Sequence, residues 1–218
     1  MVMTPVLRRG DEVRGVVLQP DGKIVAAGLA TVNPAISDYD SAVVRYNPDG
    51  SLDTTFDGDG KVTHSIGPDY DEARSVALQP DGKIVAAGVA SNGLDFDFAL
   101  LRYNPDGTLD TGFDGDGVVT TAIGGSHDVA RSVALQPDGK ILASGYAQLT
   151  NRDFAFVRYH PDGTLDTTFS GDGKVTVDLG GADVVWGVAV QPDQKIVAAG
   201  ESLIRIGNRF ALVRIFGV

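Results

Sequence analysis

The sequence has no cysteine and no long uninterrupted run of apolar residues. The first absence excludes disulfides and thiol catalysis, although it does not fix the compartment. The second excludes a membrane-spanning helix, which needs about 18 or more consecutive apolar residues. Residues 1–5 show no charged region followed by an apolar stretch, so we expect no signal peptide in this segment.

Basic residues are scarce relative to acidic ones: 18 Lys and Arg stand against 29 Asp and Glu, a net charge of −11. A nucleic-acid backbone or an anionic lipid surface requires a basic face, so we expect no nucleic-acid partner and no membrane insertion. Among the acids only Glu12, Glu72 and Glu201 are glutamate. The many aspartates and the 28 glycines favour tight turns over helices, while 43% hydrophobic residues suffice for a folded core.

Two motifs recur along the chain. The first, Gln-Pro-Asp-Gly-Lys-Ile-Val-Ala-Ala-Gly, recurs in similar form from Gln19, Gln79, Gln136 and Gln191. The second, Arg-Tyr-Asn-Pro-Asp-Gly, recurs in similar form from Arg45, Arg102 and Arg158, and Arg214 marks a fourth, shortened copy. The period of 55 to 60 residues predicts four similar units.

The sequence of each unit predicts four short strands. In the second unit these strands are 74–79, 83–88, 98–103 and 118–123. Their β-branched and apolar content fits strands, and Pro-Asp-Gly supplies the turn between the first two. Four-stranded units at this period are typical of β-propeller blades. We therefore predict one all-β domain, 1–218, a β-propeller of four four-stranded blades. The blades are 11–66, 71–123, 128–179, and 183–218 completed by 1–7.

The offset of the termini predicts how the ring closes. Aligning 11–14 with 71–74 places 2–6 on 62–66, a fourth strand, whereas the chain stops after the third strand of the last unit. Pairing the N-terminal strand with the last blade would remove both free sheet edges. We expect a monomeric ring closed in this way. The alternative is two chains that exchange closing strands to form an eight-bladed ring.

The first motif, together with Arg-Tyr-Asn-Pro-Asp-Gly-(Ser/Thr)-Leu-Asp-Thr-x-Phe-Asp-Gly-Asp-Gly, resembles the delta-60 repeat. That repeat forms β-propellers of uncharacterised function in large secreted or surface proteins of bacteria; NHL-type propellers are more distantly similar. The resemblance implies an extracellular or cell-surface location and supplies no catalytic residues. Because four copies are few for this family, an engineered or minimal propeller without a ligand is an alternative.

The two rims of the predicted propeller differ. Loops joining the first to second and third to fourth strands repeat their turn residues, whereas the other loops vary in length and content. We call this second set the variable rim: 29–39, 89–96, 146–152 and 201–208, with 67–72, 124–128 and 180–184. Loops on a rigid scaffold often carry function, although unselected loops also drift. The candidate ligand-binding residues here are Tyr39, Tyr70, Phe96, His127, Arg152, Trp186 and Arg209.

Three arginines, Arg14, Arg74 and Arg131, begin first strands near the central channel of this rim. They could hold a carboxylate or phosphate bidentately. The interpretation we favour is structural pairing with the acids that precede the third strands, Asp40, Asp97 and Asp153. In the fourth unit the arginine position is Trp186 and the aspartate position is Arg209, so both residues of the pair change together. These two residues could stack as a cation–π pair.

The Asp-Gly-Asp-Gly segments suggest calcium, for which the candidate ligands are Asp57, Asp59, Asp114 and Asp116. A further acid is missing from each loop, and turn hydrogen bonds explain the same residues, so we expect no cofactor. Within the third strands, arginines at 45, 102 and 158 should pair with aspartates eight residues later. Phenylalanines at 56, 113 and 169 should plug the repeated rim.

Catalysis has little support, because the three histidines, His64, His127 and His160, occupy different repeat positions and no catalytic motif is present. We therefore predict a non-enzymatic propeller module for protein or glycan contacts. The alternatives are a carbohydrate- or calcium-dependent binding domain and, with less support, a propeller lyase or hydrolase.

Overall fold

The computed structural model describes residues 2–7, 10–33, 35, 38–204 and 207–216. These residues form fifteen strands in four antiparallel sheets and no helix, which confirms the all-β prediction. It follows that no described segment is a helix suited to crossing a membrane.

Within each sheet, strands follow one another in chain order. Sheet 1 contains β1 (Glu12–Leu18), β2 (Ile24–Asn33), β3 (Asp38–Tyr46) and β4 (Lys61–His64). Sheet 2 contains β5 (Asp71–Leu78), β6 (Ile84–Ser91), β7 (Phe96–Tyr103) and β8 (Val118–Thr121). Sheet 3 contains β9 (Asp128–Leu135), β10 (Ile141–Gln148), β11 (Arg152–Tyr159) and β12 (Lys174–Val177). Sheet 4 contains β13 (Ala182–Val190), β14 (Ile196–Ile204) and β15 (Gly207–Ile215).

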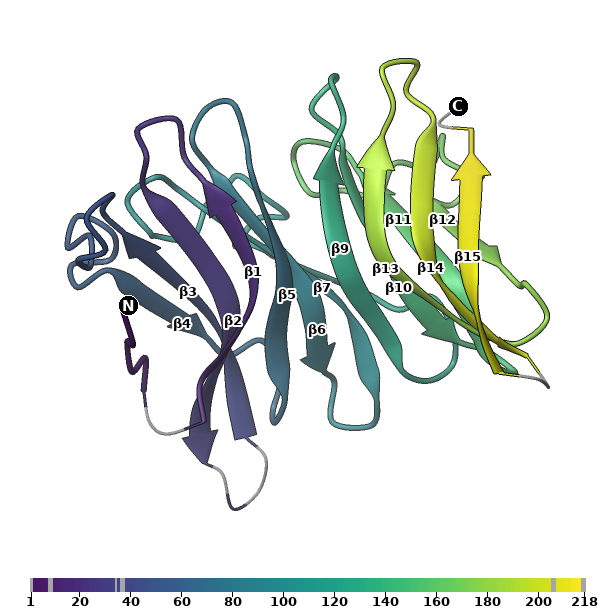
Figure 1. Cartoon of the computed structure of the whole chain (residues 1–218), viewed down its shortest axis with the longest axis horizontal. Coiled ribbons are helices and arrows are strands. Elements are labelled where there is room, and N and C mark those ends of the chain that lie inside the picture. Colours follow the sequence, from purple (N-terminus) through teal and green to yellow (C-terminus); the bar gives the residue numbers. More distant parts are fainter. Residues whose placement is uncertain (1, 8–9, 34, 36–37, 205–206, 217–218) are drawn as a thin grey trace.

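The four sheets stand side by side in chain order along the long axis of the molecule (Figure 1). Their first strands β1, β5, β9 and β13 are neighbours in that order. The turns that follow these strands lie at the upper end of Figure 1, and the β2–β3, β6–β7, β10–β11 and β14–β15 connections lie at the lower end. The lower end is therefore the variable rim.

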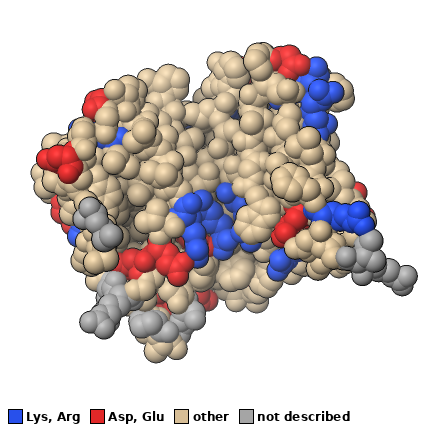
Figure 2. Space-filling view, in the orientation of Figure 1, with Lys and Arg blue, Asp and Glu red and all other residues tan. Residues whose placement is uncertain are grey.

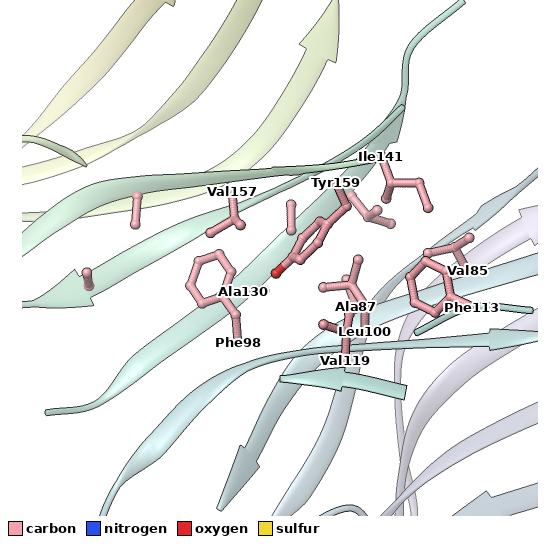
Figure 3. Packing of buried hydrophobic residues seen from close by; sticks show 14 residues of the cluster. Val85, Ala87, Phe98, Leu100, Phe113, Val119, Ala130, Ile141, Val157 and Tyr159 are labelled. Atoms are coloured by element: carbon pink, nitrogen blue, oxygen red, sulfur yellow. The ribbon is translucent and has the colours of Figure 1, made fainter. Parts of the chain in front are cut away.

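The core lies between sheets, and we call each sheet-to-sheet contact a junction. At the junction of sheets 2 and 3, Phe98 and Leu100 from β7 pack with Val133 of β9 and Ile141 of β10 (Figure 3). Phe98, Leu100 and Ile141 are fully buried. Similar clusters fill the junctions of sheets 1 and 2 and of sheets 3 and 4. Burial of each such large side chain contributes about 2 kcal/mol, so the junctions are a main source of stability.

A buried ion pair repeats near the end of each third strand in sheets 1 to 3, as predicted. The distance from arginine Nε to aspartate Oδ2 is 2.6 Å for Arg45 and Asp53 and 2.7 Å for both Arg102–Asp110 and Arg158–Asp166. Each guanidinium lies over a phenylalanine ring, with carbon-to-centroid distances of 4.7, 4.6 and 4.5 Å for Phe56, Phe113 and Phe169. Nη1 of Arg45 also donates to the Pro105 carbonyl of the next sheet at 2.5 Å. These arginines are therefore structural.

The predicted closure of the ring is not observed. Sheet 4 has three strands, and sheets 1 and 4 lie at opposite ends of the molecule (Figure 1). The packing of each junction sets the angle between neighbouring sheets, and three such junctions leave the array open. Residues 2–7 lie against sheet 1 instead, where Val6 N donates to Asp11 Oδ2 at 2.8 Å. Residues 1, 205, 206, 217 and 218 of the predicted fourth blade lie outside the described residues.

Candidate functional site on the variable rim

Each first strand carries a β-bulge at the same repeat position. The strand pairing skips one residue in each of these strands, and the skipped residues are Arg14, Arg74, Arg131 and Trp186. A bulge takes a residue out of the ladder and redirects its side chain, and bulges are common beside functional sites. We call these four residues the bulge row. They lie on adjacent inner strands at the variable-rim end.

Glu72 joins the first two members of the bulge row. Its side chain is 0% exposed, and its Oε1 lies 2.5 Å from Arg14 Nε. Its other oxygen pairs with Arg74 and accepts a hydrogen bond from the Tyr70 hydroxyl at 2.9 Å. The hydrogen bond to Glu72 raises the pKa of Arg14, and burial followed by the charge of Glu72 raises the pKa of Tyr70 to about 12. The carboxylate thus fixes two guanidinium groups.

The predicted pairing of the bulge-row arginines with Asp40, Asp97 and Asp153 is wrong. Within the described part of the chain, Arg14 pairs with Glu12 and Glu72, and Arg74 pairs with Glu72. The bulges direct these side chains to glutamates on the first strands themselves, away from the acids before the third strands.

Arg131 differs from the other two arginines. Its guanidinium carbon lies 4.1 Å from the centre of the Trp186 ring and 5.6 Å from that of Tyr146. Among the described residues it forms no ion pair, which sets it apart; its Nε, like that of Arg74, is buried without a hydrogen-bond acceptor. Burial, followed by repulsion from Arg74, lowers the pKa of Arg131. An anion placed here would supply the missing acceptor and relieve the repulsion.

Trp186 therefore stacks on Arg131, whereas the sequence suggested Arg209. Arg209 is exposed and lines a shallow depression of about 310 Å³ with Trp186, Glu201 and Phe210. Arg152 also stacks on Tyr146, with its guanidinium carbon 4.7 Å from the ring centre. The bulge row is thus flanked by aromatic rings and by further arginines.

Four candidate residues form a continuous aromatic strip along the rim. The centroid distances are 5.3 Å for Tyr39 and Tyr70, 5.7 Å for Tyr70 and Phe96, and 4.8 Å for Phe96 and His127. A shallow depression of about 450 Å³ opens beside the strip, and Tyr70, Phe96 and His127 line it together with Asp69. Through its bond to Glu72, Tyr70 connects the strip to the bulge row.

The site is locally basic in an acidic protein. Figure 2 shows Lys and Arg gathered in the lower middle of the inner face, bordered by acidic residues. Arg74 and Arg152 both lie near enough to Arg131 to disfavour its charge. The local surplus of positive charge therefore opposes the net charge of −11.

A cluster of three aspartates lies elsewhere on the same rim. Ligand oxygens of Asp153, Asp178 and Asp183 lie within 4.8 Å of one another, the one such group of three in the described part of the chain. Asp183 is fully buried, and its Oδ1 has no hydrogen-bond partner among the described residues. In sheets 2 and 3, Oδ1 of the equivalent Asp71 and Asp128 accepts a backbone N–H. Burial, then the charges of Asp178 and Asp183, raise the pKa of Asp153.

The calcium candidates from the sequence lie in tight turns on the repeated rim. Asp59 Oδ1 accepts from Lys61 N and Asp116 Oδ1 from Val118 N, each at 2.9 Å. Asp57 and Asp114 adopt left-handed backbone angles with φ of 50° and 51°. All four aspartates therefore act as turn formers.

The sequence reasoning missed Glu72 and Tyr146 as members of the site. A signal for Glu72 was present, because two of the three glutamates precede a bulge-row arginine by two positions. Tyr146 occupies the repeat position that Leu29 holds in sheet 1 and Val89 in sheet 2. The sequence repeat does not identify this position as part of a site.

No curated protein sequence matches this chain. Among solved structures, a protein of unknown function from Dyadobacter fermentans matches with a TM-score of 0.56 at 15% identity, over 91% of this chain and 59% of that one. A periplasmic gluconolactonase of Pseudomonas aeruginosa matches with a TM-score of 0.52 at 14% identity, over 92% and 56%. A catalytically inactive virginiamycin B lyase from Staphylococcus aureus, with quinupristin, matches with a TM-score of 0.51 at 9% identity, over 97% and 58%.

The chain thus spans less than two thirds of the length of these structures, and at such identities the likeness shows the fold alone. A family model matches residues 19–56, 79–113, 136–169 and 191–216, more than half of the chain, which confirms the resemblance to delta-60 repeats. The chain belongs to the family described as domain of unknown function (DUF5122) beta-propeller.

Proposed function

We propose that this protein is a non-enzymatic, extracytoplasmic binding module whose variable rim holds a glycan bearing carboxylates. One observation carries the proposal: a β-bulge holds Arg131 against Trp186 on the inner face, with no carboxylate partner in the described part of the chain. A guanidinium preorganised in this way binds a planar carboxylate through paired hydrogen bonds.

The aromatic strip supports a sugar as the carrier of that carboxylate. Aromatic rings present apolar faces and edges that pack on sugar rings, and polar neighbours fix the orientation of the ligand. Tyr70, Phe96 and Asp69 provide both kinds of group around one depression. The strip and the bulge row meet at Glu72, so an extended ligand could contact both.

The histidines support a non-enzymatic role because the structure keeps them apart. His160 Nε2 lies 3.7 Å from Asp166 Oδ1 on the repeated rim, whereas His127 packs on Phe96 at the variable rim. His64 lies in β4. The extracytoplasmic location rests on the family resemblance.

The test is calorimetry with matched ligands: an oligogalacturonate, the same oligosaccharide with its carboxylates reduced to alcohols, and a short poly-aspartate peptide. We expect binding of the acidic sugar alone, weakening with salt as ion pairs at a surface do. Equal binding of the reduced sugar would overturn the role of the carboxylate. Binding of the peptide alone would assign the rim to a protein partner, and binding of none would overturn the proposal.

A second candidate function is calcium-dependent binding, which the aspartate cluster favours. Asp153, Asp178 and Asp183 offer carboxylate oxygens to a hard cation, and the unpartnered Oδ1 of the buried Asp183 needs a donor or a positive charge. Thermal melts with calcium and with chelator test it. The Asp178→Asn variant, which changes the exposed member, should lose any calcium-induced stabilisation. An Asp59→Asn variant is the control.

A further inference from the structure

The two ends of the sheet array expose large apolar side chains. On sheet 1, Val16 and Leu18 of β1 are 64% and 68% exposed. On sheet 4, Phe210 and Leu212 of β15 are 93% and 69% exposed. Exposed apolar surface that is contiguous and ordered marks a contact site in a soluble protein.

The same repeat positions are buried wherever two sheets meet within the chain. Counterparts of Phe210 and Leu212 are Phe98 and Leu100 in sheet 2 and Phe154 and Phe156 in sheet 3, all 0% exposed. Counterparts of Val16 and Leu18 are Val76 and Leu78, Val133 and Leu135, and Val188 and Val190, which pack in the junction cores. Figure 3 shows one such junction. The two free faces are therefore the two halves of a junction that the chain already forms three times.

A single chain cannot join these halves, because they lie at opposite ends of the array (Figure 1). We propose that a second copy of this chain occupies both: sheet 4 of each copy packs on sheet 1 of the other, and two identical junctions close an eight-sheet ring. Each junction joins two different faces, and the two-fold axis repeats it with the roles of the two copies exchanged, so the ring is closed and does not grow into fibres.

The N-terminal segment is already placed for this ring. Val6 N donates to Asp11 Oδ2, as Ile66 N does to Asp71 Oδ2 at 2.6 Å. Thr4 and Val6 line a small cavity of about 60 Å³ over Ala26 and Val44 of sheet 1. Val62 of β4 and Ile66, which follows that strand, pack in the same way over Ala86 and Leu101 of sheet 2. Residues 2–7 thus occupy the position of an outermost strand that precedes sheet 1.

Sheet 4 lacks this outermost strand. In sheets 1 to 3, β3, β7 and β11 each pair with a fourth strand, whereas β15 has β14 as its neighbour and no strand on its other side within the described residues. In the proposed dimer, residues 2–7 of the partner subunit add to this edge. The addition pairs the open backbone groups of β15 and removes an exposed edge.

A polar contact of the internal junctions can be repeated as well. Arg45 Nη1 donates to the Pro105 carbonyl of the next sheet, and Arg102 Nη1 donates to that of Pro161. Arg214 holds the repeat position of these arginines and is exposed. In the dimer its acceptor is the carbonyl of Pro48 of the partner subunit. The inference does not depend on the ligand of the variable rim.

Light scattering and sedimentation velocity test the proposal on the full chain. We expect a mass of twice 22.8 kDa that does not grow with concentration. Val16→Glu and Phe210→Glu each place a charge in both junctions, so each should weaken the dimer at least about a hundredfold. Leu94→Glu changes a side chain 95% exposed on the β6–β7 loop and should leave the mass unchanged. Circular dichroism checks that each variant is folded.

Mixing the Val16→Glu and Phe210→Glu variants is the most discriminating part of this test. The Val16→Glu chain keeps an intact sheet 4 face and the Phe210→Glu chain keeps an intact sheet 1 face, so their mixture regains one unaltered junction. We expect mixed dimers where each variant alone is monomeric. A monomeric parent chain, a parent mass above that of a dimer, or dimers unaffected by both substitutions would overturn the proposal, as would failure of the mixture to associate.

Discussion

Arg131 and Trp186 stack on each other, with the guanidinium carbon 4.1 Å from the ring centre, and both are bulge residues of neighbouring inner strands. Trp186 is the only tryptophan of the chain, so tryptophan fluorescence reports on the surroundings of this one side chain. Replacing Arg131 with Gln removes the cation from the ring, and we expect a shift in the emission of Trp186. Lys195→Gln, on the repeated rim, is the control; identical spectra for the parent and both variants would argue against the stack.

Arg102→Met should strongly destabilise the fold. The substitution removes the guanidinium that lies 2.7 Å from the buried Asp110 and leaves Lys83 Nζ, also at 2.7 Å, as its remaining cationic partner. Breaking a buried pair costs about 3 to 5 kcal/mol, and because Lys83 remains we expect the lower end, about 3 kcal/mol. Lys195→Met breaks the exposed pair with Asp193 and should cost less than about 1 kcal/mol. Urea unfolding followed by circular dichroism measures both variants. Comparable costs would show that the buried pair is not a main support of the sheet.

Lowering the pH should destabilise the fold because the aspartates of these buried pairs become protonated. Burial alone would raise the pKa of Asp53 and Asp166, but hydrogen bonds from Thr55 and Lys23, and from Thr168 and Lys140, hold both pKa values well below the ordinary range. A depressed pKa gives stability that is present above the unfolded value of about 3.9 and is lost as pH falls below it.

The unfolding midpoint in urea should therefore stay high near pH 5 and fall steadily below about pH 4. Asp166→Asn should be less stable at pH 5 and should show a smaller further loss on acidification. An identical pH slope for this variant and the parent would contradict the assignment.

Gly88→Ala should also be strongly destabilising. A Cβ at this position would lie 1.8 Å from the Glu72 carbonyl oxygen, at the point where the bulge brings β5 close to β6. Backbone cannot yield as a flexible side chain does, so we expect a cost of about 3 kcal/mol or more. Gly125→Ala places its Cβ in open space and is the matched control. Equal melting temperatures for the two variants would refute the close approach.

The parts of this fold that local chemistry decides could be predicted from the sequence. The strands follow from short apolar runs bounded by Pro-Asp-Gly turns, and the pairing of Arg45 with Asp53 follows from a spacing of eight residues along one hairpin. Tyr39, Tyr70, Phe96 and His127 were candidates because all four fall in rim loops, but their packing into one aromatic strip is seen only in the structure.

The bulge row and the open array could not be predicted in the same way. A bulge arises where the pairing of two strands shifts by one residue. The sequence around Arg74 and Arg131 contains no local signal of such a shift. The partner of Arg14 is 58 residues away in Glu72, across a junction. Closure depends on the angle between sheets, which packing sets and sequence periodicity does not encode.

The most direct test of the rim as a binding site is a titration of the parent chain and of Arg131→Gln with oligogalacturonate, followed by Trp186 emission and by calorimetry. The parent should bind, Lys195→Gln should bind equally well, and Arg131→Gln should bind at least about tenfold more weakly because one charge-assisted pair is lost. Equal affinity of the Arg131 variant and the parent would contradict the account.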